Sequence, residues 1–328
     1  MAMSSELPQP VAAAQSSGRV PDFFIVGHHK SGTTAMYEML KDHPQIYMPE
    51  MKEPEFFGRD LARRQQALPG AGAQKRTFAG TRPHTYEEYL SLFADAEPRQ
   101  RAGEASPSYL GSLTAATQIS EVQPAARIIA ILREPASFLR SLHLQMVRNR
   151  VQSERDLGRA IASEGLADQD GRVQRYTDRV RYVEQLRRYH HLFGAEQVLV
   201  LIYDDFRADN EATVRTVLRF LDVEVEVPIK AVDANPTVAA RSRVLDEWTH
   251  SLRAGRGPLA RGMKATVKAL TPPRLRRNAV RTIVYGGAPP LDEALMLDLR
   301  RRYKPEVVAL SEYLKRDLVK LWGYDSIG

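Results

Sequence analysis

The sequence predicts an α/β protein whose parallel sheet is covered by helices on both faces. Three short apolar segments support this prediction: residues 23–26, 127–132 and 197–202. Stretches with helical periodicity separate them, and strands of a parallel sheet have this continuous apolar character because both of their faces are buried. With 328 residues, of which 43% are hydrophobic and 27% charged, the chain has the composition of a globular protein.

The chain is expected to consist of a disordered N-terminal tail, residues 1–20, and a single domain over residues 21–328. The tail is rich in Ala, Ser, Gln and Pro, and it lacks the basic start and apolar stretch of a signal peptide. No apolar run approaches the roughly 20 residues that cross a bilayer. The chain has no cysteine, which excludes disulfides, thiolate metal sites and cysteine nucleophiles. We expect a cytoplasmic location.

The first apolar segment leads through a small polar loop into a helical stretch. The loop, residues 27–34, places Gly27 and Gly32 at the spacing of a Walker A phosphate loop. A helix N-terminus behind such a loop offers N–H groups and a positive dipole end to an anion. Thr33 stands where Walker A has lysine, and the lysine lies inside the loop at Lys30, which disfavours a Mg-NTP hydrolase. The alternative is a simple Gly/Ser/Thr turn with a solvent-facing lysine.

A short segment downstream, residues 51–57, pairs a lysine with a glutamate. Lys52 and Glu53 precede Pro54, which holds them in extended or turn geometry. A glutamate beside a phosphate-type site is a candidate general base for an alcohol. The alternative is an exposed Lys–Glu ion pair without a chemical role.

The second apolar segment ends in a residue that suits a second phosphate. Arg133 follows residues 127–132, and Ser141 lies about two helical turns further on, in a helix expected from residue 136 to about residue 150. A guanidinium at the carboxyl end of a strand and a nearby hydroxyl can together hold a phosphate. A hydrogen bond from Arg133 to a backbone carbonyl is the alternative.

The third apolar segment, residues 197–202, is preceded by an amphipathic run at residues 180–193. Tyr203 follows the segment, at the carboxyl edge where parallel sheets bind ligands. Asp204 and Asp205 come next, and capping of the following helix is their alternative role.

Basic residues concentrate in one stretch near the C-terminus. Residues 241–281 hold 11 basic and 2 acidic residues, a net charge of +9, whereas the whole chain carries +7. Such a stretch suits a polyanionic ligand, a membrane surface or nucleic acid, and a solvated basic face is the alternative. It lacks the interleaved aromatics of a single-strand binder, so we expect no nucleic-acid partner and keep peripheral membrane contact open.

Five motifs follow one another along the chain. They are G-H-H-K-S-G-T-T at residues 27–34, K-E-P-E-F-F at 52–57, G-E-A-S-P-S-Y-L at 103–110, I-I-A-I-L-R-E-P at 128–135 with Ser141, and I-Y-D-D-F at 202–206. In this order they resemble the sulfotransferases that use 3′-phosphoadenosine 5′-phosphosulfate (PAPS), most closely the bacterial and Golgi carbohydrate-type branch. The resemblance runs from about residue 23 to residue 220, with a weaker echo at residues 299–322.

The resemblance implies a three-layer α/β/α fold with a central parallel sheet, of the P-loop nucleotide-kinase type. It also implies which residues bind PAPS and its product PAP: Lys30, Ser31, Gly32, Thr33 and Thr34 for the 5′-phosphosulfate, Arg133 and Ser141 for the 3′-phosphate, and Tyr203 for the adenine. No metal is required in this scheme, because fixed cations and N–H dipoles can stabilise an in-line transfer of a sulfuryl group.

The implied reaction moves the sulfuryl group from PAPS to a hydroxyl of a carbohydrate, a glycolipid or a secondary metabolite. The partner is then a small-molecule, sugar or lipid-linked acceptor. Glu53 would take the proton from the acceptor hydroxyl, and Lys30 would stabilise the leaving group at the bridging oxygen. Lys52 would orient the acceptor or the sulfuryl oxygens. The alternative function is a P-loop small-molecule kinase that uses Mg-ATP.

Several positions depart from the family pattern. His28 and His29 stand where many relatives have a small residue and proline, and Glu55 stands where they have histidine. The histidines are either extra donors when protonated or packing groups. Glu55 either raises the pKa of Glu53 or points away from it. A C-terminal closing loop of the family has no clear match; residues 276–288 occupy roughly the right stretch, and none of them is assigned a role.

Overall fold

The computed structural model describes residues 18–58, 60, 82–149, 151–164, 176–230, 238–240, 285–287 and 291–328. The chain forms two compact units. The first takes in Met1–Pro135, Glu164–Ala234 and Tyr303–Gly328, and the second takes in Ala136–Ser163 and Asn235–Arg302. The expectation of a single domain over residues 21–328 stays a prediction. Most of the expected tail and all of the basic stretch at residues 241–281 lie outside the described residues.

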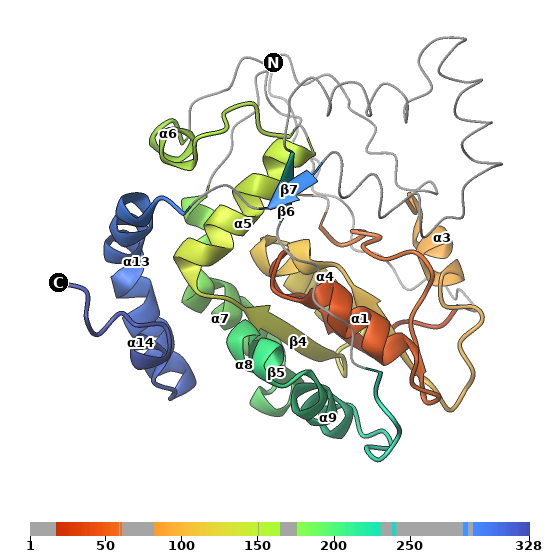
Figure 1. The fold of residues 1–328 in the computed structure, drawn as a ribbon. Helices are drawn as coiled ribbons and strands as arrows, with labels where there is room; N and C mark the ends of the chain where they lie inside the picture. Colours follow the sequence, from red (N-terminus) through yellow and green to blue (C-terminus); the bar gives the residue numbers. More distant parts are fainter. Residues whose placement is uncertain are drawn as a thin grey trace, which may run out of the picture. The chain divides into compact units, whose positions relative to one another are not determined.

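The first unit is built on a five-stranded sheet with the strand order β2-β3-β1-β4-β5. Figure 1 labels two of its strands, β4 and β5. The strands are β1 (Phe23–Ile25), β2 (Ile46–Tyr47), β3 (Arg101–Ala105), β4 (Arg127–Leu132) and β5 (Val198–Ile202). Every neighbouring pair is parallel, and Phe24 of β1 lies opposite Glu104 of β3 and Ile128 of β4. The predicted α/β class with a central parallel sheet is confirmed.

Helices connect these strands. The first unit contains α1 (Thr33–Lys41), α3 (Tyr86–Ser91), α4 (Ala115–Val122), α7 (Tyr182–Leu192), α8 (Tyr203–Ala208), α9 (Asn210–Phe220) and α14 (Leu318–Leu321), with 3₁₀ turns η1 (Pro107–Gly111), η2 (Thr177–Val180) and η3 (Ala195–Gln197). No helix within the described ranges is long and apolar enough to cross a membrane.

The second unit contains most of α5 (Pro135–Arg148), α6 (Leu157–Ala162) and an antiparallel pair, β6 (Val238–Ala240) and β7 (Tyr285–Gly287). A long helix, α13 (Glu293–Leu314), begins in the second unit and ends in the first.

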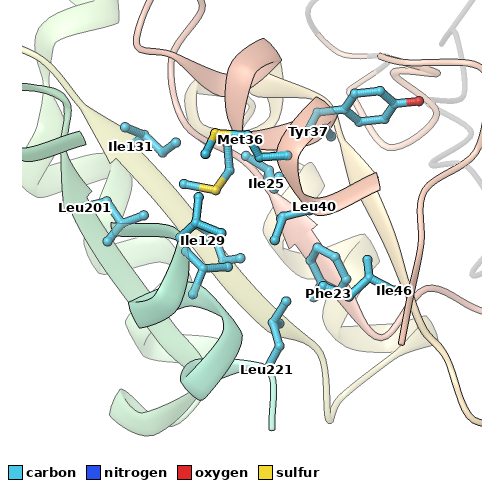
Figure 2. Packing of buried hydrophobic residues seen from close by; sticks show 14 of the residues in the cluster. Phe23, Ile25, Met36, Tyr37, Leu40, Ile46, Ile129, Ile131, Leu201 and Leu221 are labelled. Atoms are coloured by element: carbon cyan, nitrogen blue, oxygen red, sulfur yellow. The ribbon is translucent and has the colours of Figure 1, made fainter. Parts of the chain in front are cut away.

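One face of the sheet packs against α1, α8 and α9. Figure 2 shows this cluster, in which Ile25 and Ile129 come from the strands, Met36 and Leu40 from α1, and Leu221 from the residue after α9. All five side chains are fully buried or nearly so. Because burial of one such side chain contributes roughly 1.5–3 kcal/mol, this cluster fixes α1, and with it the loop that precedes α1.

The opposite face of the sheet carries aromatic side chains. Phe24 points away from Ile25 because side chains alternate along a strand, and its ring centroid lies 6.1 Å from that of Phe57. Phe57 contacts Tyr109 of η1 at 6.0 Å, and the hydroxyl of Tyr189 in α7 donates to the carbonyl oxygen of Tyr109 at 2.9 Å. Helices therefore cover both faces, and the predicted three layers are confirmed.

The parallel arrangement brings the carboxyl ends of the strands to one edge of the sheet. Residues 27–32 follow β1, Ser106 follows β3, Arg133 follows β4 and Tyr203 follows β5. The candidate site is built at this edge.

Candidate active site

The loop between β1 and α1 lies close to the neighbouring strand. A Cβ added at Gly27 would lie 2.3 Å from the backbone nitrogen of Ile131, so only glycine allows this approach. The N–H of His28 donates to the carbonyl oxygen of Ile131 at 3.3 Å. Lys30 and Gly32 both adopt left-handed conformations, with φ of 67° and 86°. The loop thus turns tightly before α1 begins at Thr33.

The N-terminus of α1 has the features of an anion site. Gly32 caps the helix without a side-chain hydrogen bond, and the first turn holds no acidic residue. The hydroxyl of Ser31 is fully buried and has no hydrogen-bond partner among the described residues. Thr33 is buried and Thr34 is exposed. An anionic oxygen is the partner that this hydroxyl and the helix N–H groups lack, so the loop fits a phosphate or sulfate group.

Arg133 contacts both this loop and Tyr203, the residue that follows β5. Its Nη1 donates to the carbonyl oxygen of Lys30 at 3.0 Å, and its guanidinium lies 4.8 Å from the ring centroid of Tyr203. The hydroxyl of Tyr182 donates to the carbonyl oxygen of Arg133 at 2.9 Å. The carbonyl contact, which the sequence left as an alternative, is therefore present. Burial lowers the pKa of Arg133, and a guanidinium keeps its charge at neutral pH despite such a shift.

Ser141, the expected companion of Arg133, belongs to the second unit. It lies on α5 and is buried there. Its part in holding a 3′-phosphate stays a prediction.

The acids after β5 bind the C-terminal segment. Asp204 accepts a hydrogen bond from Nε1 of Trp322 at 2.9 Å. Asp205 forms a bidentate ion pair with Arg316, in which Nη1 and Nη2 of Arg316 lie 2.6 and 2.7 Å from the two carboxylate oxygens. Both acids lie in the first turn of α8, and the next helix, α9, is capped by Asp209. The alternative that the two acids cap the next helix is therefore wrong.

Lys52 and Glu53 form an ion pair that is mostly shielded from solvent. Lys52 Nζ lies 2.7 Å from Glu53 Oε1, and the two side chains are 17% and 16% exposed. His29 Nδ1 lies 4.0 Å from the same carboxylate oxygen. The predicted alternative was an exposed pair, and its exposure is wrong, because the pair lies partly buried beside His29 of the loop between β1 and α1.

The segment that carries Glu53 is held in an unusual backbone conformation. Glu53 and Glu55 adopt left-handed φ angles of 60° and 53°. The N–H of Glu53 donates to the carbonyl oxygen of Ala105 at 3.1 Å, and the N–H of Glu55 donates to the hydroxyl of Ser106 at 3.1 Å. The Glu55 carboxylate forms an ion pair with Arg82. The second carboxylate expected on the acceptor side is thus neutralised by an arginine.

His28 is a packing and hydrogen-bonding group rather than a cation. Burial lowers its pKa to about 3, and the charge of Arg179 lowers it further. Its Nε2 lies 2.9 Å from Oε1 of Gln185, whose Nε2 donates to the carbonyl oxygen of Asp178 at 2.9 Å. Because this second bond orients the amide, Nε2 of the neutral His28 carries the proton.

His29 is also held toward its neutral form. Burial lowers the pKa of His29, while the carboxylates of Glu53 and Glu55 raise it. The alternative that His28 and His29 act as protonated hydrogen-bond donors is therefore disfavoured at neutral pH.

Two side chains near the site, those of Glu104 and Tyr324, were not predicted from the sequence. Glu104 is fully buried at the end of β3, where the only signal was a glutamate inside a conspicuous motif. Tyr324, near the C-terminus, donates from its hydroxyl to the carboxylate of Glu134, the neighbour of Arg133. The weaker resemblance to the family at residues 299–322 ends just before Tyr324. It was the only feature of the sequence that pointed toward this contact.

Comparisons with known proteins agree on one family. A family model described as the sulfotransferase family matches residues 21–227. The bifunctional heparan sulfate N-deacetylase/N-sulfotransferase 1 of Caenorhabditis briggsae is 21% identical over 259 residues, which are 76% of this chain and 28% of the relative. The human heparan sulfate glucosamine 3-O-sulfotransferase 3B1 is 25% identical over 150 residues, 44% of this chain and 32% of the relative. The chain thus spans about a third or less of these relatives.

A solved structure shares the fold. The sulfotransferase from Alicyclobacillus acidocaldarius has a TM-score of 0.63 and 23% sequence identity, and the match covers 91% of this chain and 97% of the other.

Proposed function

This chain belongs to the sulfotransferase family, and we propose that it transfers a sulfuryl group from PAPS to a hydroxyl of a carbohydrate, glycolipid or secondary-metabolite acceptor. The observation that carries the proposal is the N-terminus of α1, which no side chain caps, together with the buried Ser31 hydroxyl, which has no hydrogen-bond partner among the described residues. Arg133 donates to the Lys30 carbonyl in the same loop. Relatives named for heparan sulfate support a carbohydrate among the possible acceptors.

The loop residues form the donor site in this proposal. PAPS supplies a sulfuryl group that is activated by its bond to the 5′-phosphate. The N–H groups of Thr33 and Thr34, with the Ser31 hydroxyl, would bind the 5′-phosphosulfate at the positive end of the α1 dipole. Lys30 would neutralise the charge that develops on the bridging oxygen. Removal of one donor that is pre-positioned toward such a charge typically raises a barrier by about 2.7–4 kcal/mol.

Arg133 and Tyr203 form the nucleotide end of the site. Arg133 would bind the 3′-phosphate with the donors that do not contact the Lys30 carbonyl. Tyr203 would contact the adenine with its ring, whose position is fixed against the Arg133 guanidinium.

Glu53 is the proposed base on the acceptor side. Its carboxylate would accept the proton of the acceptor hydroxyl as the oxygen bonds to sulfur, on the side opposite the leaving bridging oxygen. Lys52, 2.7 Å from Glu53 Oε1, holds this carboxylate in place and would orient the acceptor or the sulfuryl oxygens. We propose that no metal takes part, because these cations and N–H groups would stabilise the negative charges of the donor and of the leaving group that a metal would otherwise stabilise.

The test of this function is a transfer assay with two donors. The protein is incubated with PAPS and a panel of oligosaccharide, glycolipid and small phenolic acceptors, and PAP release and acceptor mass are measured. The proposal expects an acceptor that gains the mass of a sulfuryl group. A phosphorylated acceptor from Mg-ATP, with no reaction from PAPS, would replace the proposal with the kinase alternative.

A further inference from the structure

Glu104 carries a buried carboxylate that no step of the proposed reaction uses. It lies in β3 and is fully shielded from solvent. Its Oε2 accepts hydrogen bonds from the hydroxyls of Tyr89 at 2.9 Å and Tyr109 at 3.1 Å. Its Oε1 is buried and has no hydrogen-bond partner in the described part of the chain. A buried carboxylate with incomplete hydrogen bonding is unfavourable, so its presence calls for a specific reason.

Tyr109 connects this carboxylate to the segment that carries Glu53. The Tyr109 hydroxyl donates to Glu104, and it accepts a hydrogen bond from the N–H of Phe57 at 3.2 Å. A hydroxyl has one proton and two lone pairs. Because Glu104 takes the proton, a lone pair of Tyr109 is directed at the Phe57 amide.

The same segment is anchored at every second residue. The N–H groups of Glu53, Glu55 and Phe57 donate in turn to Ala105, Ser106 and Tyr109, all at the carboxyl end of β3 or just beyond it. Two of these donors have left-handed backbones, and that conformation costs roughly 1–2 kcal/mol for each residue other than glycine. The segment therefore depends on these hydrogen bonds to keep its shape.

We propose that Glu104 is a positioning residue for the acceptor side of the site. It orients the Tyr109 hydroxyl, which holds the Phe57 amide and thereby the turn that presents Glu53 beside Lys52. Glu104 itself touches no reacting atom, because it is fully buried beneath this turn. The inference rests on the proposed function of Glu53.

Two tyrosines of this cluster provide a matched pair of variants. Tyr109→Phe and Tyr89→Phe each remove one hydroxyl that donates to Glu104 Oε2, and both tyrosines are fully buried. Only the Tyr109 hydroxyl also accepts from the Phe57 amide. The Tyr89 ring stacks on Phe56 with a centroid distance of 4.8 Å, and phenylalanine keeps that contact.

The kinetic split between the two variants tests the inference. In sulfuryl-transfer assays, Tyr109→Phe should lower kcat by about tenfold or more and leave the KM for PAPS unchanged, because only the acceptor side is misplaced. Tyr89→Phe should keep kcat within about twofold. It loses one buried hydrogen bond, whereas Tyr109→Phe loses two, so Tyr109→Phe should also lose more thermal stability. Equal values of kcat in the two variants would overturn the inference.

Substitutions of Glu104 provide a second, independent measurement. Glu104→Ala removes the acceptor of both hydroxyls, whereas Glu104→Gln keeps an amide oxygen that can accept both. We expect kcat to fall in Glu104→Ala as much as in Tyr109→Phe. In Glu104→Gln, kcat should lie within a few-fold of the value for the unsubstituted protein. The double variant Glu104→Ala/Tyr109→Phe should be no slower than the slower single variant, since both act through one contact.

The outcomes separate this inference from the proposed function. If the unsubstituted protein transfers no sulfuryl group, both fail. If it does transfer one, and the kcat losses of Glu104→Ala and Tyr109→Phe multiply in the double variant, only the positioning role of Glu104 is overturned.

Discussion

Arg133 donates a hydrogen bond from Nη1 to the carbonyl oxygen of Lys30 at 3.0 Å. Arg133 is the first residue after β4, and Lys30 lies in the loop after β1, the strand next to β4. The bond therefore joins the carboxyl ends of two adjacent strands. It also places the guanidinium between the loop that would hold one end of the donor and Tyr203, which would hold the other.

The hydroxyl of Ser31 should affect stability and binding in opposite directions. The Ser31 hydroxyl is buried and has no hydrogen-bond partner in the part of the chain that the structure describes, and such a hydroxyl costs about 1–3 kcal/mol. Ser31→Ala should therefore raise the free energy of unfolding while weakening the affinity for PAP by about tenfold. Chemical denaturation and calorimetric titration measure the two effects.

Ser108 provides the control for this prediction, because its hydroxyl is also buried and has no hydrogen-bond partner within the described ranges, but it lies in η1. Ser108→Ala should be stabilising and should bind PAP like the unsubstituted protein. Undiminished PAP binding by Ser31→Ala would remove Ser31 from the donor site.

Lys30 should matter for turnover far more than for folding. Lys30→Ala removes the cation expected at the bridging oxygen, and kcat should fall by on the order of 10²–10³. Lys315 offers a matched control, since it also has a left-handed backbone, with φ of 51°, and its side chain is exposed. Steady-state kinetics and melting curves of Lys30→Ala and Lys315→Ala should show similar stability and a large difference in kcat. Near-normal turnover in Lys30→Ala would exclude this role.

Glu53 should be needed for the acceptor and not for the donor. Glu53→Gln keeps the size of the side chain but removes the base, so kcat should fall by roughly 10²–10⁴ with little change in PAP affinity. The control is Glu50→Gln, because Glu50 also pairs with a lysine, Lys41, at 2.5 Å, but its side chain is 91% exposed. Assays of both variants with the same acceptor make the comparison. Equal activity of the two would assign the proton transfer to another group.

Glu104 should make the stability of the protein depend on pH. Burial raises the pKa of Glu104 from 4.5 to about 7, so between these values the folded state binds more protons than the unfolded state. The free energy of unfolding should therefore fall as pH rises from about 5 to 7, by up to about 1.4 kcal/mol per pH unit from this group. In Glu104→Gln this contribution should vanish. Denaturation at pH 5 and pH 7.5 compares the two proteins, and identical pH dependence would show that Glu104 ionises normally.

The strands that could be predicted are those whose sequence shows burial on both faces. The segment predicted at residues 127–132 is β4 as observed, because its apolar run is unbroken. β3 was missed, because its five residues include Gly103 and two charged side chains. The glycine has a packing reason that only the structure reveals: a Cβ there would lie 2.1 Å from the ring of Phe23.

The candidate site also has a part that could be predicted from the sequence and a part that could not. Lys30, Arg133 and Tyr203 could be placed together, since each follows the end of a predicted strand of one parallel sheet. The contacts of the C-terminal segment could not, because Asp205 and Arg316 are 111 residues apart and Glu134 and Tyr324 are 190 apart. No local pattern encodes such pairs.

The position of Glu104 beneath the Glu53 turn was also beyond sequence reasoning. It depends on the left-handed backbones of Glu53 and Glu55, and these conformations are held by hydrogen bonds to residues about 50 positions away. Side-chain type alone does not indicate that a glutamate will adopt such a conformation.

The most direct test of the donor site is a calorimetric titration with PAP in the absence of metal and, separately, with Mg-ATP. Arg133→Ala is compared with Arg127→Ala, because Arg127 lies at the other end of β4, bonds the Phe220 carbonyl and lies 5.7 Å from the Phe220 ring centroid. We predict metal-free PAP binding that is weakened about tenfold or more by Arg133→Ala and is unchanged by Arg127→Ala. Preference for Mg-ATP, with no binding of PAP, would contradict the proposal and favour a kinase.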